Sequence, residues 1–318
     1  MKHNLPIKID LPEHFLEEEV RCGYTVTTKQ KKIWAVELDL LAEFMRVCDK
    51  YDLKWFVGYG SLLGIVRHKG FIPWDNDIDV AITRRSFDKL CKVASLEFQE
   101  PYFLQTPITE KGRYFRTICK LCNSHTTGAS ELEWLQGINC GLFIDVFILD
   151  EIPDDDKEVE KMFKKIDYYR HFARFYSPYA RHDNLKKKLK NLIWTMLWKY
   201  KYQSCGGDVL FKKMSDYLSQ FASENSHRWM ALEVDPVRSL HLDKSHWSET
   251  IMADFEFMKV PIPNGYDWIL TDHYGDYMEM PPVDQRINHE YLELEPEIPY
   301  KQFFNVGGNS HISTGGDR

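Results

Sequence analysis

Three aspartates at alternate positions, Asp75, Asp77 and Asp79, constrain the fold of this chain more than any other feature. Ile78 and Val80 alternate with them, as in a half-buried strand, where side chains two positions apart point to the same face. Like charges on one face repel each other, so a bound cation would remove the cost of this arrangement. Ligands that are all oxygens suit Mg²⁺ or Mn²⁺ better than Zn²⁺. The spacing therefore predicts a metal site on a sheet, and a solvated acidic turn is the alternative.

A fourth acid, Asp145, interrupts the apolar run Leu142 to Ile148. A lone carboxylate in such a run is costly unless it is paired or bound to a metal. We therefore predict a strand buried on both faces, next to the strand of Asp79, with both acids on one face. Asp145 would be a metal ligand or a general base, together with Asp77 and Asp79. The alternative is an ion pair between Asp145 and a buried Arg or Lys.

A Gly60-Ser61 pair separates an apolar strand over Trp55 to Gly58 from a short helix over Ser61 to Arg67. Glycine lets the backbone approach a phosphate closely, and the amides at the beginning of a helix attract anions. The pair is therefore a candidate phosphate site. Arg67 is a candidate phosphate clamp, and a solvated arginine at the end of a helix is the alternative.

Two further residues are candidates for the same site. Lys120 belongs to a strand predicted over Tyr114 to Leu121 and would neutralise donor phosphates, although a surface lysine is the alternative. His289 would shuttle a proton or contact a phosphate, and a hydrogen-bonded structural histidine is the alternative.

Strands alternate with helices over the first 150 residues, which predicts an α/β or α+β fold with a mixed sheet flanked by helices, and the second half of the chain is mainly helical. A long helix is predicted from Thr27 or Thr28 to about Tyr51. We divide the chain into a catalytic core over residues 25–155, a helical region over residues 156–304 whose C-terminal loop completes the site, and a disordered tail over residues 305–318.

Charge and hydropathy limit the partners. The formal net charge of −7 argues against a nucleic-acid-binding protein. The N-terminal region has no apolar core of the signal-peptide type, and no apolar run reaches the ~18 residues of a membrane span, so a cytoplasmic location is expected. The lysine-rich run Leu185 to Tyr202 favours a core helix with its lysines in solvent. The alternative is a peripheral contact with an anionic membrane, at its inner face.

Several segments strongly resemble the LicD family, which includes bacterial phosphorylcholine transferases and is related to fukutin-type enzymes. The resemblance spans about residues 30 to 292. It rests on Gly60-Ser61-Leu62-Leu63-Gly64, Arg67-His68, Phe71-Ile72-Pro73-Trp74-Asp75-Asn76-Asp77-Ile78-Asp79, Gly141-Leu142-Phe143-Ile144-Asp145-Val146-Phe147-Ile148-Leu149-Asp150, and the segment from Val260 through Tyr274-Gly275-Asp276-Tyr277-Met278 to Pro282, with Arg286 and His289 beyond. A departure is Asn76, where the family often has another aspartate.

This resemblance implies a nucleotidyltransferase-like fold, Mg²⁺, and transfer of a phospho-alcohol from a CDP-activated donor, such as CDP-choline, to a sugar hydroxyl of a glycan or lipid-linked acceptor, with release of CMP. Phosphoryl transfer needs charge neutralisation and in-line positioning more than a covalent nucleophile, which agrees with a site built from carboxylates. Transfer of a nucleotidyl group from an NTP uses the same carboxylates and remains the alternative reaction. A metal-free binding module is the alternative of another class.

Overall fold

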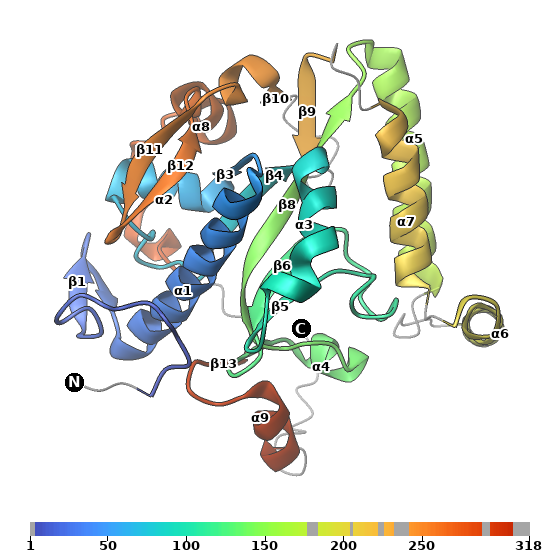
Figure 1. Ribbon diagram of the computed structural model, residues 1–318, viewed down its shortest axis with the longest axis horizontal. Helices are drawn as coiled ribbons and strands as arrows, with labels where there is room; N and C mark the ends of the chain where they lie inside the picture. Colours follow the sequence, from blue (N-terminus) through green and yellow to red (C-terminus); the bar gives the residue numbers. More distant parts are fainter. Residues whose placement is uncertain are drawn as a thin grey trace.

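A mixed β-sheet with helices packed against it forms the centre of the protein (Figure 1). The computed structural model describes residues 4–176, 184–203, 206–221, 226–231, 242–287 and 293–307. The strands are β1 (Glu19–Arg21), β2 (Tyr24–Val26), β3 (Trp55–Val57), β4 (Asp79–Thr83), β5 (Tyr102–Gln105), β6 (Cys119–Asn123), β7 (Thr127–Ala129), β8 (Leu142–Ile152), β9 (Arg228–Ala231), β10 (Leu242–Asp243), β11 (Thr250–Phe255), β12 (Met258–Pro263) and β13 (Glu293–Glu295). The helices are α1 (Thr28–Tyr51), α2 (Tyr59–His68), α3 (Arg84–Glu97), α4 (Glu131–Gln136), α5 (Asp156–Tyr176), α6 (Leu185–Tyr202), α7 (Gly207–Leu218), α8 (Tyr266–Tyr274) and α9 (Tyr300–Gly307). The predicted α+β class is confirmed.

Strand β8 organises the sheet because it pairs along both of its edges. One edge lies parallel to β4, which in turn pairs antiparallel with β3. The other edge pairs antiparallel with β6 near the beginning of β8 and with β9 near its end. Strands β5 and β10 then pair with β6 and β9. This arrangement places the predicted acid-bearing strands, β4 and β8, side by side.

The two faces of the sheet have different surroundings. Ile144, Val146 and Ile148 of β8 are buried on the face that α1 and α3 cover (Figure 1). Asp145 and Phe147 point to the opposite face and are only half-buried. The prediction that this strand is buried on both faces therefore holds only toward its end, where Leu149, on the same face as Asp145 and Phe147, is fully buried.

Helix α1 begins and ends where its sequence predicts. The Thr27 side chain accepts a hydrogen bond from the backbone N–H of Gln30 at 3.3 Å, and Asp52 ends the helix in the left-handed conformation. The apolar side chains between them are buried against the sheet. The helix predicted to run to about Tyr51 is thus confirmed, and β3 and α2 match the strand predicted over Trp55 to Gly58 and the helix predicted over Ser61 to Arg67.

Two predicted segments differ from the structure. Strand β6 begins only at Cys119, because residues 114–118 form a loop in which the Tyr114 hydroxyl donates to the Ile118 carbonyl at 2.9 Å. The C-terminal loop predicted to complete the site is in part a strand, because residues 260–263 belong to β12, which pairs with β11. Prolines are tolerated in a two-stranded sheet because each strand has an open edge.

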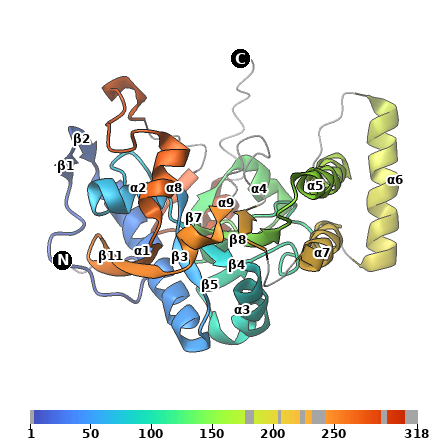
Figure 2. The same cartoon turned by 90° about the horizontal axis from the view of Figure 1, so that it is seen from above.

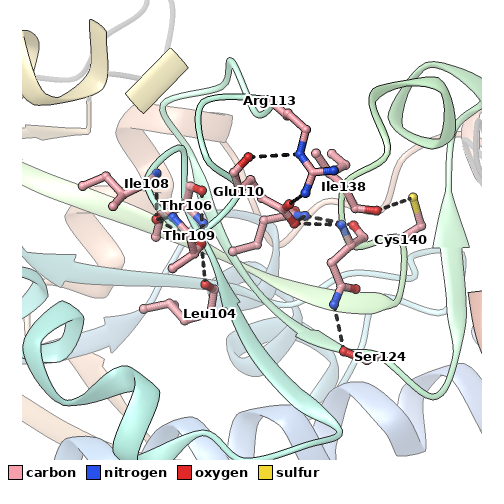
Figure 3. A network of polar contacts seen from close by, with 11 residues as sticks. Leu104, Thr106, Ile108, Thr109, Glu110, Arg113, Ser124, Ile138 and Cys140 are labelled. Carbon is pink, nitrogen blue, oxygen red and sulfur yellow. Dashed lines mark hydrogen bonds and ion pairs between the residues drawn. The ribbon is translucent and has the colours of Figure 1, made fainter. Parts of the chain in front are cut away.

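A buried carboxylate fixes the turn that leads into β8. Glu110 accepts hydrogen bonds from the side chain of Gln105 at 3.0 Å and from the backbone N–H of Asn139 at 2.7 Å. Arg113 donates to its other oxygen at 3.1 Å. Figure 3 shows this network, which links the loop after β5 to the residues just before β8. The contacts fix the backbone of Asn139, three residues before β8 begins.

Helices α5, α6 and α7 follow the sheet, and α6 stands at the outer edge of the molecule beyond α5 (Figure 2). The prediction that α6 is a core helix is wrong. Its large apolar side chains are exposed over about half of their surface or more, except for the less exposed Trp194. They are Leu185, Leu189, Leu192, Ile193, Met196, Leu197 and Tyr200. In the described part of the chain, no helix combines the length and apolar character needed to cross a membrane.

Candidate active site

Strands β4 and β8 bring two of the predicted acids together. Asp79 and Asp145 are direct partners in the parallel pair, so their side chains share a face of the sheet. The backbone N–H of Asp145 donates to the Ile78 carbonyl at 2.9 Å, which extends the pairing by one residue. The expectation that these strands are neighbours is confirmed.

Asp75 and Asp77 lie before β4, in an extended loop rather than in the strand itself. Helix α1 holds this loop: the Trp34 indole donates to the Asp75 carbonyl at 2.9 Å, and the Gln30 side chain donates to the Pro73 carbonyl at 2.8 Å. The prediction that all three acids belong to one strand is therefore corrected. They gather because the loop is fixed against α1.

Helix α2 begins directly against these carboxylates. A β-carbon placed on Gly60 would lie 3.6 Å from an oxygen of Asp75 and 3.7 Å from an oxygen of Asp79. The backbone N–H of Asp79 donates to Ser61 Oγ at 2.8 Å. The backbone of Gly60 also donates to the Asp79 carboxylate. A backbone amide at the beginning of α2 thus already donates to the side chain of Asp79, and a role of these amides in phosphate binding stays a prediction.

Burial and mutual repulsion change the acidity of this cluster. Desolvation, followed by the negative charge of Asp75, raises the pKa of Asp77 to about 8. Desolvation and the charges of Asp77, Asp145 and Asp75 raise the pKa of Asp79 well above its usual range. Desolvation likewise raises the pKa of Asp75. Asp77 therefore retains its proton near neutral pH unless a cation balances the cluster.

The sequence predictions missed a further acid. Glu37 of α1 is 1% exposed, and its Oε2 has no hydrogen-bond partner among the residues that the structure describes. Burial, and then the charges of the four aspartates led by Asp77, raise its pKa well above the usual range. A signal was present in the sequence, because Glu37 occupies the apolar stripe of the helix, four residues after Ile33 and three before Leu40.

Asp145 lies between a cation and the other acids. Lys120 is its direct partner on β6 and lowers its pKa, but desolvation dominates and the pKa rises to about 6. The Lys120 ammonium donates to Glu133 at 2.9 Å and lies 3.5 Å from the ring centre of Phe143. Asp145 Oδ1 is enclosed and has no hydrogen-bond partner in the described part of the chain. Lys120 is thus a buried residue of the site, not a surface lysine, and its strongest contact is with Glu133.

Arg67 lies at the end of α2, where it donates to the carbonyls of Tyr277 at 3.0 Å and Glu279 at 3.1 Å. These contacts tie α2 to the segment after α8. Tyr274 of α8 faces the acids: burial, and then the charges of Asp79 and its neighbours, raise its pKa to about 12. Arg67 has no carboxylate partner within 4 Å in the described parts of the chain.

Arg286 is a second guanidinium near this position. It donates to the carbonyls of Pro281 at 2.8 Å and Cys22 at 2.9 Å, and it lies 5.5 Å from the ring centre of Trp74. Its charge, like that of Arg67, depresses the pKa of His68. The two arginines lie close enough to affect each other's charge, and neither forms an ion pair with a carboxylate of the described residues. The predicted residue His289 lies outside the described residues.

The donor set of the cluster suits a hard divalent cation. All of its donors are carboxylate oxygens, one of which, Asp145 Oδ1, is enclosed without a partner. Among the residues that the structure describes, no three acidic, histidine or cysteine side chains are already arranged to hold a metal ion. The chemistry of the residues fits Mg²⁺ or Mn²⁺, and the assignment stays a prediction.

Comparison with known proteins gives consistent relatives. Residues 52–128 match the family model described as "LicD/FKTN/FKRP, nucleotidyltransferase domain". The chain is 30% identical over 269 residues to the lipopolysaccharide cholinephosphotransferase LicD of Haemophilus influenzae, an alignment that covers 80% of this chain and 94% of that protein. A shorter stretch of 81 residues, 26% of this chain and 28% of the other, is 31% identical to an uncharacterised protein of Rickettsia prowazekii.

Proposed function

Since the chain belongs to the LicD family, we propose that it is a transferase of the cholinephosphotransferase type. It moves a phospho-alcohol, phosphocholine or a similar group, from a CDP-activated donor to a sugar hydroxyl of a cell-surface glycan and releases CMP. The printed name of the Haemophilus influenzae relative supports choline phosphate as the group and lipopolysaccharide as the class of acceptor. We also propose that the enzyme uses Mg²⁺ or Mn²⁺ and works in the cytoplasm.

The observation that carries this proposal is the juxtaposition of Asp79 and Asp145 on one face of the sheet, with the loop acids Asp75 and Asp77 beside them. These four residues would hold the metal. When bound, the metal would neutralise the donor phosphates and the charge that develops as the phosphoryl group moves. A structural acidic turn would not need two acids in register on adjacent strands.

The other residues of the site have roles that follow from their contacts. Ser61 holds the backbone of Asp79, and Gly60 leaves room above the carboxylates that any side chain would fill. Arg67 and Arg286 supply positive charge for the donor phosphates, since neither has a nearby carboxylate among the described residues. Lys120 moderates the charge of Asp145 and is itself held by Glu133.

Asp145 is placed for one of two roles. It would bind the metal, or it would take the proton from the acceptor hydroxyl. Its pKa of about 6 suits a general base that works near neutral pH, because such a group is mostly ionised and still accepts a proton readily.

The reaction is tested by supplying the purified protein with Mg²⁺ and either CDP-choline, CDP-ribitol, CDP-glycerol or CTP, together with a glycan acceptor. The proposal predicts that CMP appears with a CDP compound and depends on the acceptor. Release of pyrophosphate from CTP, without CMP from any CDP compound, would instead show nucleotidyl transfer.

Two variants sharpen this test. Asp79→Asn should abolish product formation, because it removes a carboxylate of the cluster. Asp49→Asn is the matched control, since Asp49 is exposed on α1 and away from the site, and it should keep full activity. Full activity of the Asp79→Asn protein would contradict the assignment of the site.

A further inference from the structure

Helix α6 carries an apolar stripe that faces away from the rest of the protein. Its exposed apolar residues recur at steps of three and four positions, from Leu185 to Tyr200, so they lie along one side of the helix. Asn191 is 6% exposed and lies roughly half a turn from the centre of this stripe. Among the described side chains of α6 only Asn191 is buried, on the side opposite the stripe, and the helix stands at the outer edge of the molecule (Figure 2), so the stripe faces away from the rest of the protein.

The charge of α6 is as unusual as its exposure. The helix contains six lysines and no acidic residue, although the whole chain has a net charge of −7. The lysines are Lys186, Lys187, Lys188, Lys190, Lys199 and Lys201. Several of them flank the stripe, where their long side chains can extend along an apolar surface while the ammonium groups stay in water.

These observations select one class of partner. A nucleic acid would match the lysines but would leave the apolar stripe in water. A purely apolar protein groove would cover the stripe but would not use the lysines. The surface of an anionic membrane satisfies both, because its acyl region accepts apolar side chains and its headgroups attract cations. The lysines also exclude a helix that crosses the bilayer, in agreement with the absence of a membrane-spanning helix among the described residues.

We propose that α6 is a membrane-binding helix, which lies in the plane of an anionic phospholipid surface with the stripe from Leu185 to Tyr200 inserted among the acyl chains. The attachment is a property of α6 and does not depend on the transfer reaction. It would keep the protein at a membrane surface while the sheet and its acids remain in water.

Vesicle sedimentation of the full chain tests the proposal without measuring turnover. The vesicles are made of phosphatidylcholine alone, or of phosphatidylcholine mixed with the anionic lipid phosphatidylglycerol. We expect the protein to sediment with the anionic vesicles, and this binding should weaken as salt is added. Absence of binding to the anionic vesicles would overturn the proposal.

Two variants separate the contributions of the helix. Leu189→Gln combined with Ile193→Gln removes the middle of the stripe, and it should weaken binding about tenfold or more because apolar burial drives the insertion. Replacing Lys186, Lys187 and Lys188 with glutamine should remove the preference for anionic vesicles. Both sets of residues are exposed, so circular dichroism should show an unchanged fold.

A matched control is available on α3. Leu96 is 70% exposed, and Leu96→Gln should bind vesicles as the wild type does. Equal losses for the Leu96 and the α6 variants would show that no specific surface is involved. Light scattering measures the oligomeric state of the wild type and of the variant with the Leu189 and Ile193 substitutions. If these substitutions convert a dimer to a monomer without affecting vesicle binding, a second copy of the chain covers the stripe and the proposal is wrong.

Discussion

Two aspartates of the same strand, Asp145 and Asp150 of β8, should respond in opposite ways to replacement by alanine. Asp145 Oδ1 is enclosed, and no described residue forms a hydrogen bond with it. Asp150 is 1% exposed, and its two oxygens accept hydrogen bonds from Arg84 at 2.7 and 2.8 Å. Asp145 in its ionised form therefore lowers the stability of the fold, whereas Asp150 completes a buried ion pair with Arg84.

The size of each effect follows from these surroundings. The pKa of Asp145 is raised to about 6. An unperturbed aspartate titrates near pH ~3.9, so keeping Asp145 ionised costs about 3 kcal/mol. Because the folded-state pKa is the higher one, this cost is absent below about pH 4, grows as the pH rises to about 6, and is constant above. Asp145→Ala should therefore stabilise the metal-free protein by about 1–3 kcal/mol near neutral pH, after allowance for lost packing.

Asp150→Ala has the opposite sign, because it leaves the Arg84 guanidinium buried without its partner. Removing one member of a buried pair typically costs about 3–5 kcal/mol. This loss should persist throughout the neutral range, since Arg84 stays charged.

Urea unfolding followed by circular dichroism measures both variants, in EDTA, at about pH 4 and about pH 7.5. Turnover with Mg²⁺ and the donor is measured in parallel. Asp145→Ala should be inactive and at least as stable as the wild type at the higher pH, with the difference vanishing at the lower one. A strongly destabilised but catalytically active Asp145→Ala protein would refute the reasoning, because it would mean that Asp145 serves a structural ion pair.

Three further predictions concern the metal, a histidine and a glycine. Mg²⁺ should raise the melting temperature of the wild type, and Asp77→Asn should remove this rise. EDTA should abolish turnover, and unchanged activity in excess EDTA would exclude a metal requirement. Burial and the charge of Arg67 lower the pKa of His68 to about 4, so neutral His68 contributes about 1–3 kcal/mol to the free energy of unfolding above pH ~6.5, and this contribution is lost as the pH falls toward 4. Urea unfolding of His68→Gln should therefore show a smaller loss of stability between pH ~6.5 and pH 4 than the wild type shows, and an equal loss would contradict the assignment. Gly141→Ala would place a β-carbon 2.0 Å from the carbonyl oxygen of Asn123, so thermal unfolding should reveal a loss of about 3 kcal/mol or more, and a neutral effect would show that β6 and β8 can separate there.

The sequence was most informative where local pattern and chemistry coincide. The alternation around Asp79 and the lone acid in the run of Asp145 predicted adjacent strands, and the register of β4 with β8 confirms it. The long helix α1 was predicted from its cap and its stripe. Periodicity is a local property, and these features depend on little else.

Other features depend on contacts that no local pattern contains. Glu37 reaches the acids only because α1 crosses the sheet at that position, and Arg286 comes near Arg67 through the fold of the C-terminal segment. The stripe of α6 was visible in the sequence, but a stripe does not say what covers it, and the core location was therefore predicted wrongly. The pairing of β12 with β11 was hidden by its prolines.

The parallel pairing of β4 with β8 also determines when the site forms as the chain folds. Parallel strands need a long crossover, which here contains α3, β5, β6, β7 and α4. Pairing over such a separation is slow, because the entropy of closing the loop opposes it. Asp79 meets Asp145 only after that step. A divalent ion would then find its complete set of ligands only in the folded sheet. Its binding would stabilise the fully folded protein and would not speed the formation of the folding nucleus.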